Sequence, residues 1–184
     1  MPTKPTILKR KTLACTRLFR IESMDLEFSN GERRQYERLV RGSSGGAVLV
    51  VPILDRDTVL LVREYAAGVH RYELGFPKGK IDGSEDILEA ANRELKEEIG
   101  YGSRKMEYLT SLTIAPGYLE HATNIILAQD LYEEKLSGDE PEELEVIPWQ
   151  LNNIDNLISS GECSEARSLA ALFLTLEYFK REKC

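Results

Sequence analysis

The chain has 184 residues, of which 42% are hydrophobic and 30% charged, and its formal net charge is −7. The length fits one domain, or one domain with an N-terminal extension, and the composition is ordinary for a soluble globular protein. The acidic balance argues against a broad basic surface for long nucleic acids, and no apolar run approaches transmembrane length. We therefore expect neither nucleic acid nor a membrane as a partner.

The three cysteines and the first residues indicate the compartment. Cys15, Cys163 and Cys184 are odd in number and far apart, so they have neither disulfide nor metal-site spacing. The N-terminal stretch has basic residues but no apolar signal core. These features predict reduced thiols and a cytoplasmic protein.

The first 45 residues are predicted to form an antiparallel β-meander. Strands are expected at residues 13–21, 24–28 and 34–40, and Asn30-Gly31 is a strong hairpin signal. Residues 41–46 should then form a flexible break. Alternating apolar faces on three extra strands would leave an exposed patch in a monomer. We therefore expect residues 1–45 to be a dimerisation element of a homodimer.

Residues 46–184 are predicted to form the second domain, with an α/β fold. Strands are expected at 47–53, 58–65, 72–74, 105–115, 124–128 and 144–148, and helices at 151–159 and 165–180. The last helix has a broad apolar face that includes Phe173. Strands of a mixed sheet with separated helices indicate an α/β/α sandwich.

A further helix is expected between Gly83 and Gly100. Ser84 is a candidate N-cap, and Gly100 ends the helix. An apolar stripe of about 120° is expected from five residues at helical spacing. These residues are Ile87, Leu88, Ala91, Leu95 and Ile99.

Glutamates crowd this helix, and two of them fall on its apolar side. At about 100° per residue, Glu94 and Glu98 lie within or beside the apolar stripe, whereas Glu97 lies further round and can pair with Arg93. A lone buried carboxylate is costly unless a cation or several donors face it. The pattern favours a site for a hard divalent cation, with a solvated acidic helix as the alternative.

The stretch Gly79–Tyr101 resembles the Nudix box in its full spacing. The matching positions are Gly79, Glu85, the run Arg93-Glu94-Leu95, the pair Glu97-Glu98, and Gly100. Tyr101 departs from the aliphatic residue that is usual there. Pro116, fifteen residues beyond Tyr101, and most of the chain from Lys4 to Phe179 resemble the ADP-ribose pyrophosphatase branch of this family.

The resemblance implies the Nudix α/β/α sandwich with a mixed sheet, and a homodimer. It also implies hydrolysis of the pyrophosphate bond in ADP-ribose, diadenosine polyphosphates and NADH, releasing AMP. The implied cofactor is Mg²⁺, with Mn²⁺ as an alternative ion. Arg93 would orient the acids. The implied metal ligands are Glu94 and Glu98 directly, Glu97 directly or through water, Glu85 through water or at a second metal, and a backbone carbonyl, most simply that of Lys78.

The general base lies outside the box, and the resemblance suggests the acidic loop 139–143. Glu140 is the favoured base, and Glu142 is a candidate additional metal ligand; the alternative is that this loop is a solvated turn. Glu120 and His121 form a rival site, since an imidazole titrates near neutrality.

Candidate substrate contacts are less specific. Arg63 ends a core strand and is a candidate for phosphate binding, with a structural ion pair as the alternative. Arg38 and Arg41 are candidates for reaching the active site of a partner subunit, and Glu120 is a further candidate contact. Lys78 and Lys80 are candidates for offsetting phosphate charge. Phe19 and Tyr36 are candidates for stacking on adenine.

Two other functions remain open at this stage. One is a Nudix enzyme acting on RNA 5′ ends or damaged nucleoside triphosphates, which the low basicity and Pro116 argue against. The other is a Nudix ligand sensor without catalysis, which the complete set of box acids argues against.

Overall fold

The computed structural model describes residues 2–40 and 46–182. They form two compact units, one of Met1–Gly46 with Thr113–Ala122 and one of Ala47–Leu112 with Thr123–Cys184. The sequence-based boundary at 45/46 did not assign Thr113–Ala122 to the first unit. The expected break at 41–46 lies outside the described residues, except for Gly46. No helix in the described ranges is long and apolar enough to cross a membrane.

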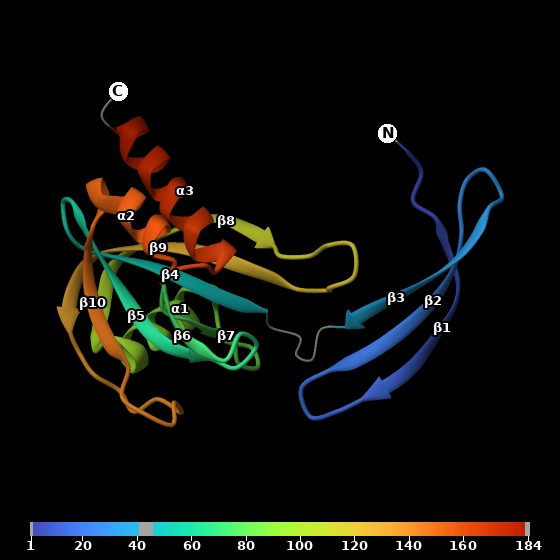
Figure 1. Cartoon of the computed structure of the whole chain (residues 1–184), viewed down its shortest axis with the longest axis horizontal. Coiled ribbons are helices and arrows are strands. Elements are labelled where there is room, and N and C mark those ends of the chain that lie inside the picture. Colours follow the sequence, from blue (N-terminus) through green and yellow to red (C-terminus); the bar gives the residue numbers. More distant parts are fainter. Residues whose placement is uncertain (1, 41–45, 183–184) are drawn as a thin grey trace. The chain divides into compact units, whose positions relative to one another are not determined.

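The first unit contains the predicted antiparallel meander (Figure 1). Its strands β1 (Thr6–Cys15), β2 (Arg20–Glu27) and β3 (Arg33–Val40) form a sheet in that order. The turn at Asn30-Gly31 is confirmed: Gly31 has φ of 83° and its N–H donates to the Phe28 carbonyl at 2.9 Å. Glycine suits this turn because positive φ carries no steric cost for it.

The predicted strand at residues 13–21 is wrong, because the chain turns between β1 and β2. The Thr16 hydroxyl accepts hydrogen bonds from the N–H groups of Leu18 (3.3 Å) and Phe19 (3.0 Å), and the Thr16 N–H donates to the Phe19 carbonyl at 2.8 Å. A threonine side chain can close a turn in this way without glycine or proline. Most of β1 was missed as a result.

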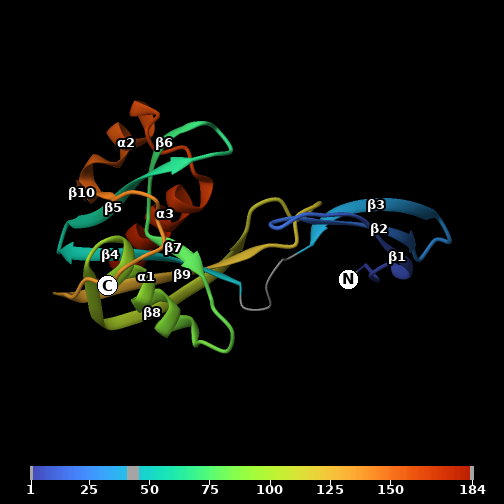
Figure 2. The same cartoon turned by 90° about the horizontal axis from the view of Figure 1, so that it is seen from below.

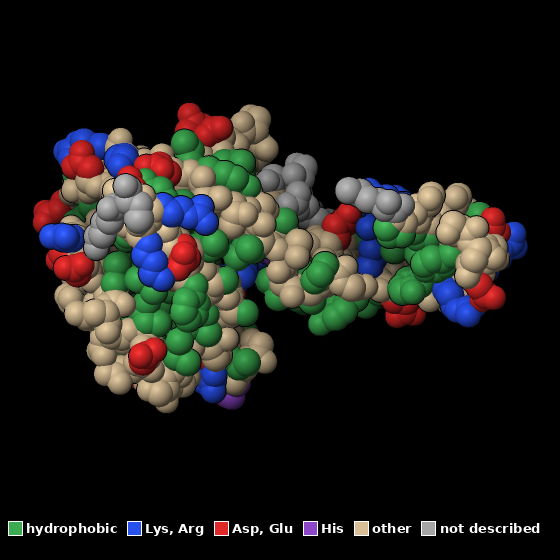
Figure 3. Space-filling view, turned by 90° about the horizontal axis from the view of Figure 1, so that it is seen from above, with side chains coloured by type: hydrophobic (Ala, Val, Ile, Leu, Met, Phe, Trp, Pro, Cys, Tyr) green, Lys and Arg blue, Asp and Glu red, His purple; other side chains and the backbone are tan. Residues whose placement is uncertain are grey.

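Apolar side chains remain exposed on the first unit. All residues of β1 are exposed, and Figure 3 shows apolar side chains gathered on the visible face of this unit. The exposed large apolar residues of the meander are Ile7, Leu8, Leu13, Leu18, Phe19 and Tyr36. The patch that the sequence predicts is therefore present.

The second unit is built on a seven-stranded mixed sheet. The main path is β10-β5-β4-β9-β8, with β6 paired to β5 and β7 to β4. Strands β4 and β9 are parallel, whereas β5 is antiparallel to β4, β6 and β10. The strands are β4 (Ala47–Asp55), β5 (Thr58–Ala66), β6 (Arg71–Gly75), β7 (Lys78–Lys80), β8 (Tyr101–Thr113), β9 (Ala122–Glu133) and β10 (Glu145–Gln150).

Helices cover both faces of this sheet, as the sequence predicts. In β4, Leu49 and Val51 pack with residues of α2 (Ile154–Ser160) and α3 (Ala166–Glu182), whereas Val48 and Val50 pack with α1 (Ile87–Glu98). Successive strand residues point to opposite faces, so β4 is apolar at every position before its last residue, Asp55. Figure 2 shows α2 and α1 on opposite sides of the strands, which confirms the α/β/α sandwich.

Helix boundaries differ from the prediction in small ways. Asp86, not Ser84, caps α1 by accepting from the Leu88 N–H at 2.8 Å, with Glu89 completing a capping box. Leu88 is 40% exposed and does not join the core. The helix ends as expected, since Gly100 follows with φ of 75°.

The last two helices also show small differences. The predicted helix at 151–159 begins as a 3₁₀ turn, η1 (Leu151–Asn153), before α2. In α3, Phe173 is 53% exposed, and the fully buried side consists of Ser168, Ala171, Leu172 and Thr175. The apolar face of α3 is therefore narrower than expected.

Candidate active site

The acidic face of α1 is buried where the helical wheel predicts. Glu94 and Glu98 are only 7% and 8% exposed, although both carry carboxylates. They share this side of α1 with Leu95 and Ala91, which pack against β4 and β5. Carboxylates are rarely this buried without partners, so the surroundings of each carboxylate indicate what it can do.

Gly79 provides the space for one of these carboxylates. A Cβ atom placed on Gly79 would lie 2.0 Å from the Glu94 carboxylate, which no side-chain atom can do. Glycine is therefore required in β7 for close approach to Glu94. Glu98 sits next to the same strand and accepts from the Lys78 N–H at 3.3 Å through both oxygens.

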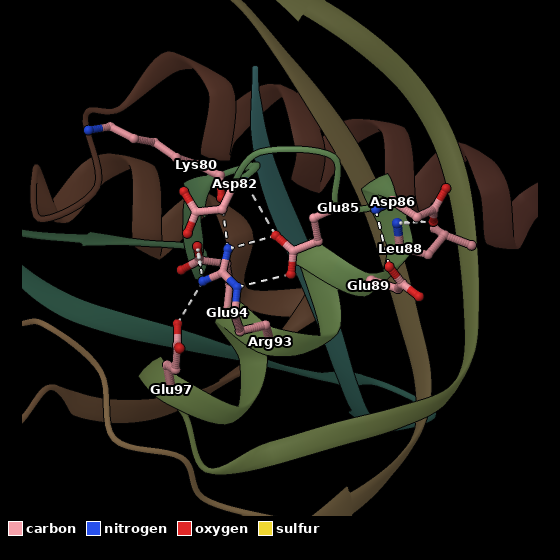
Figure 4. A network of polar contacts seen from close by, with 9 residues as sticks. All are labelled: Lys80, Asp82, Glu85, Asp86, Leu88, Glu89, Arg93, Glu94 and Glu97. Carbon is pink, nitrogen blue, oxygen red and sulfur yellow. Dashed lines mark hydrogen bonds and ion pairs between the residues drawn. The ribbon is translucent and has the colours of Figure 1, made fainter. Parts of the chain in front are cut away.

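Arg93 holds three acids at once (Figure 4). Its guanidinium contacts Glu94 at 2.8 Å, Glu97 at 2.8 Å and Glu85 at 3.1 Å. It also donates to the Lys80 carbonyl at 2.8 Å. The pair with Glu97 is the one that the spacing predicts. The spacing does not predict the contacts with Glu85 and Glu94. Together with the Lys80 carbonyl, these two carboxylates occupy the remaining donors of the guanidinium.

Burial dominates the proton affinity of the two inner carboxyls. It raises the pKa of Glu94 to about 7, partly opposed by Arg93, and the pKa of Glu98 to about 8, partly opposed by Lys78. The hydrogen bond from Arg93 instead holds the pKa of Glu85 below its ordinary value. A nearby cation would therefore stabilise the ionised forms of Glu94 and Glu98 most.

These acids line a pocket of about 660 Å³ in the second unit. It is formed by β5, β7, Asp82 in the connection before α1, the C-terminal half of α1, and the loop that precedes β10. The lining residues are Glu64, Lys78, Gly79, Lys80, Asp82, Arg93, Glu94, Glu97, Glu98, Ser137, Gly138, Asp139, Glu140 and Pro141. A pocket of this volume accommodates a small-molecule ligand.

The donors in this pocket suit a hard divalent cation. Among the described residues, no three His, Cys, Asp or Glu side chains are already arranged to enclose a metal. Mg²⁺ does not need such a cage, since it keeps several waters and uses one or two carboxylates together with substrate phosphates. Glu94 and Glu98 are two such carboxylates. Glu97 also lines the pocket, whereas Glu85 lies behind Arg93 and does not.

The two candidate glutamates of the acidic loop, Glu140 and Glu142, have different surroundings. Glu140 lines the pocket, and after burial and Glu97 its charge contributes to the raised pKa of Glu94. Glu142 does not line the pocket; its carboxylate accepts a hydrogen bond of 2.7 Å from the Tyr72 hydroxyl. The structure therefore does not bring Glu142 to the box acids, because the side chains on either side of Pro141 have different neighbours.

The arginines predicted for the substrate have other partners. Arg63 pairs with Glu145 at 2.9 Å and Glu162 at 2.8 Å and is not in the pocket lining, so the structural ion pair is what we observe. In the first unit, Arg38 pairs with Glu22 at 2.8 Å and with Glu120 at 3.4 Å. Arg41 lies outside the described residues.

His121 belongs to the first unit with Glu120. The aromatic candidates of that unit, Phe19 and Tyr36, are exposed, and Tyr36 lies 6.3 Å from the ring of Phe28.

Glu64 is a pocket residue that the sequence analysis missed. It forms an ion pair with the Lys78 ammonium group at the edge of the pocket. Strand alternation contained the signal: Val62 packs on the α1 side of the sheet, so Glu64, two residues later, shares that side, whereas Arg63 does not. Asp82, which lies before α1, is a second lining residue that the sequence analysis did not identify.

Comparison with known proteins identifies the family of the chain. The sequence model of the NUDIX domain matches residues 44–164, and that of the NudE-type Nudix hydrolase N-terminal domain matches residues 5–38. The chain belongs to the Nudix hydrolase family, which confirms the resemblance of the box. Nudix hydrolases generally depend on divalent metals.

The relatives narrow the branch. The chain is 52% identical over 177 residues to the ADP compounds hydrolase NudE of Escherichia coli (strain K12), covering 96% of this chain and 94% of the relative. It is 30% identical over 172 residues to an ADP-ribose pyrophosphatase of Bacillus subtilis (strain 168), covering 90% and 91%. A crystal structure of an ADP compounds hydrolase superposes with a TM-score of 0.92 at 50% identity, covering 99% of this chain and 97% of the other.

Proposed function

We propose that this chain hydrolyses the pyrophosphate bond of ADP-linked compounds in a divalent-metal-dependent reaction and releases AMP. The observation that carries the proposal is the pair of buried carboxylates, Glu94 and Glu98, which face one pocket beside Gly79. Relatives named ADP compounds hydrolase and ADP-ribose pyrophosphatase support the choice of substrate. The substrates that we propose are ADP-ribose, diadenosine polyphosphates and NADH.

The proposed cofactor is Mg²⁺, with Mn²⁺ as an alternative. Glu94, Glu98 and the Lys78 carbonyl would hold it, and Glu97 would be a further or water-mediated ligand. Glu85, which is outside the pocket lining, would contribute only through water or at a second metal. When bound, the cation would neutralise the pyrophosphate and the charge that develops on it during water attack. Zinc fits less well, since the proposed donors are all oxygens.

The chain's own residues account for proton transfer and positioning. Glu140 would accept a proton from the attacking water as the water oxygen bonds to phosphorus and the bridging P–O bond breaks. The displaced phosphate leaves with the bridging oxygen. Arg93 would keep Glu85, Glu94 and Glu97 in place without touching substrate, because its donors are already engaged. Glu120 and His121 are the rival bases.

Lys78 and Lys80 would offset phosphate charge from the edge of the pocket. Both residues line it, on the strand that also carries Gly79. For Arg63 we retain the role of an ion-pair residue, since Glu145 and Glu162 both contact it. Arg38, Arg41 and Glu120 remain candidates for contacts that a partner subunit would complete.

We also propose a homodimer in which the first unit is the contact element. The support is the set of exposed apolar side chains on β1 and its turns, which a monomer would leave in water. Light scattering after size exclusion should give twice the monomer mass; a monodisperse monomer would contradict the dimer. The proposed compartment is the cytoplasm, where Cys15 and Cys163, both free, would stay reduced.

Product analysis tests the activity directly. The protein with Mg²⁺ and ADP-ribose should produce AMP and ribose 5-phosphate, and chelation by EDTA should stop the reaction. Binding of ADP-ribose without any product would instead indicate a sensor. Rates with ADP-ribose, NADH, diadenosine triphosphate and capped RNA, measured side by side, would then rank the substrates.

A further inference from the structure

A second cavity lies directly beside the acidic pocket. Its volume is about 410 Å³, and its lining shares Glu64 and Lys78 with that pocket. The two cavities therefore meet across the Glu64–Lys78 ion pair. A volume of this size falls within the roughly 300–1,000 Å³ typical of small-ligand sites. Of its lining, only Lys78 has a role in the proposed reaction.

One wall of the second cavity comes from the β5–β6 hairpin and consists of an aromatic residue beside small residues. Tyr65 is 43% exposed. Ala66, Gly68 and Leu74 form the rest of this wall, and Ala66 and Gly68 project little or no side chain into the cavity. The Tyr65 ring is held edge-on by His70 at 5.9 Å and Tyr72 at 5.8 Å between centroids, and its hydroxyl is hydrogen-bonded to His70 Nδ1 at 2.5 Å. The ring is thus positioned before any ligand arrives.

The opposite side of the second cavity is polar but already internally paired. Ser164 is hydrogen-bonded to Glu73 at 3.0 Å, and Arg167 pairs with Glu165 at 2.5 Å. Lys78, the other cation of the lining, is paired with Glu64. With each cation matched by a carboxylate, the cavity does not favour an additional anion. It suits a neutral ligand with a flat ring and hydroxyl groups.

We propose that this second cavity binds the second nucleoside of dinucleotide substrates, the one on the far side of the pyrophosphate from the adenosine that all the proposed substrates share. This proposal rests on the proposed function. A nucleoside is neutral, its base stacks on an aromatic ring, and its ribose hydroxyls can reach Ser164 and the carboxylates. The low wall formed by Ala66 and Gly68 tolerates bases of different shape, which suits the half of the substrate that varies.

The test compares substrates with and without a second base. In Tyr65→Ala, the KM for NADH and diadenosine triphosphate should rise about tenfold, the scale expected from a lost base–aromatic stack. The KM for ADP-ribose should change less than about twofold, because its second half has no base to stack. Tyr65→Phe should retain the low KM values, since it keeps the ring. Tyr108→Ala is the matched control, as Tyr108 is 52% exposed, against 43% for Tyr65, but lines neither cavity.

Three results would overturn the proposal: unchanged KM values in Tyr65→Ala, an equal rise for all three substrates, or an equal loss in Tyr65→Phe. Thermal unfolding of each variant would identify a folding defect. If the wild type hydrolyses none of these compounds, the proposed function fails independently. Adenosine titration of wild type and Tyr65→Ala would then still test the cavity: weaker binding by the variant supports it, and equal binding refutes it.

Discussion

The helix α1 and the loop at residues 137–143 are both acidic, yet they teach different lessons about how side chains reach a site. In α1, a fixed rotation per residue places Glu94 and Glu98 together on the buried side. In the loop, Glu140 lines the pocket while Glu142 bonds to Tyr72. Helical spacing specifies direction, whereas acidic composition in a loop specifies only charge.

Removing an inner carboxylate of α1 should have the largest effect. Glu98→Gln should lower kcat by about 10³-fold, because a metal contributes several kcal/mol to transition-state stabilisation and 1.36 kcal/mol corresponds to a factor of ten. Steady-state kinetics with ADP-ribose, alongside metal binding by calorimetry, would measure this. A near wild-type kcat would show that Glu98 is not a metal ligand and would favour the alternative of a solvated acidic helix.

The two glutamates of the loop should differ sharply from one another. Glu140→Gln should reduce kcat by about 10²-fold or more, the usual contribution of a general base, with metal binding intact. Glu142→Gln is the matched control and should change kcat less than about twofold, since Glu142 does not line the pocket and the glutamine oxygen can still accept from the Tyr72 hydroxyl. If Glu140→Gln retains most of its kcat, Glu120 and His121 become the leading candidates for the base.

The close fit of Gly79 should make a single methyl group costly. Gly79→Ala places Cβ against the Glu94 carboxylate, so Glu94 must move, and metal affinity should fall by about 10–100-fold, as when ligand positioning is disturbed. Gly117→Ala is a suitable control, because its Cβ would meet nothing within 4 Å. Equal metal affinity in both variants would show that Glu94 does not need its present position.

The smallest expected effect is on stability as a function of pH without metal. The folded-state pKa values of Glu94 and Glu98, about 7 and about 8, lie above the ordinary value of 4.5. Between these values the folded protein binds more protons than the unfolded chain, so these groups make stability fall as pH rises from about 4.5 to about 8. The increase in Tm on adding Mg²⁺ should grow over the same range.

A double variant isolates this contribution. In Glu94→Gln/Glu98→Gln, thermal unfolding in EDTA should lose part of the pH dependence of the wild type between pH 5 and pH 8, on the order of a few degrees in Tm. Unchanged pH dependence would mean that the two carboxyls titrate normally in the folded protein.

Most helices and strands of the second unit were predictable from the sequence, whereas most of β1 was not, and single residues show why. The apolar run of β4 and the stripe of α1 fixed the sheet, the helix and the burial of Glu94 and Glu98. The turn at residues 16–19 was missed because a threonine hydroxyl closes it. The cap of α1 was misplaced by two residues because Ser84 and Asp86 are both good N-caps and only the capping box with Glu89 decides between them.

Contacts between distant residues were the part that spacing could not supply. Nothing near Arg63 in the sequence indicates that Glu145 and Glu162 face it. The partner of Glu142 is likewise 70 residues away, at Tyr72. Glu64 is an intermediate case, since strand alternation predicts its side of the sheet but not its pairing with Lys78.

The contacts of Arg93 affect the charge balance of the site when no metal is bound. A guanidinium bonded to three carboxylates is an internal counter-ion, so it offsets part of the charge of Glu85, Glu94 and Glu97 without metal. A zinc finger behaves in the opposite way, because its metal supplies the folding energy. In the proposed reaction, the divalent cation would act on the substrate and would not be needed to hold the scaffold together.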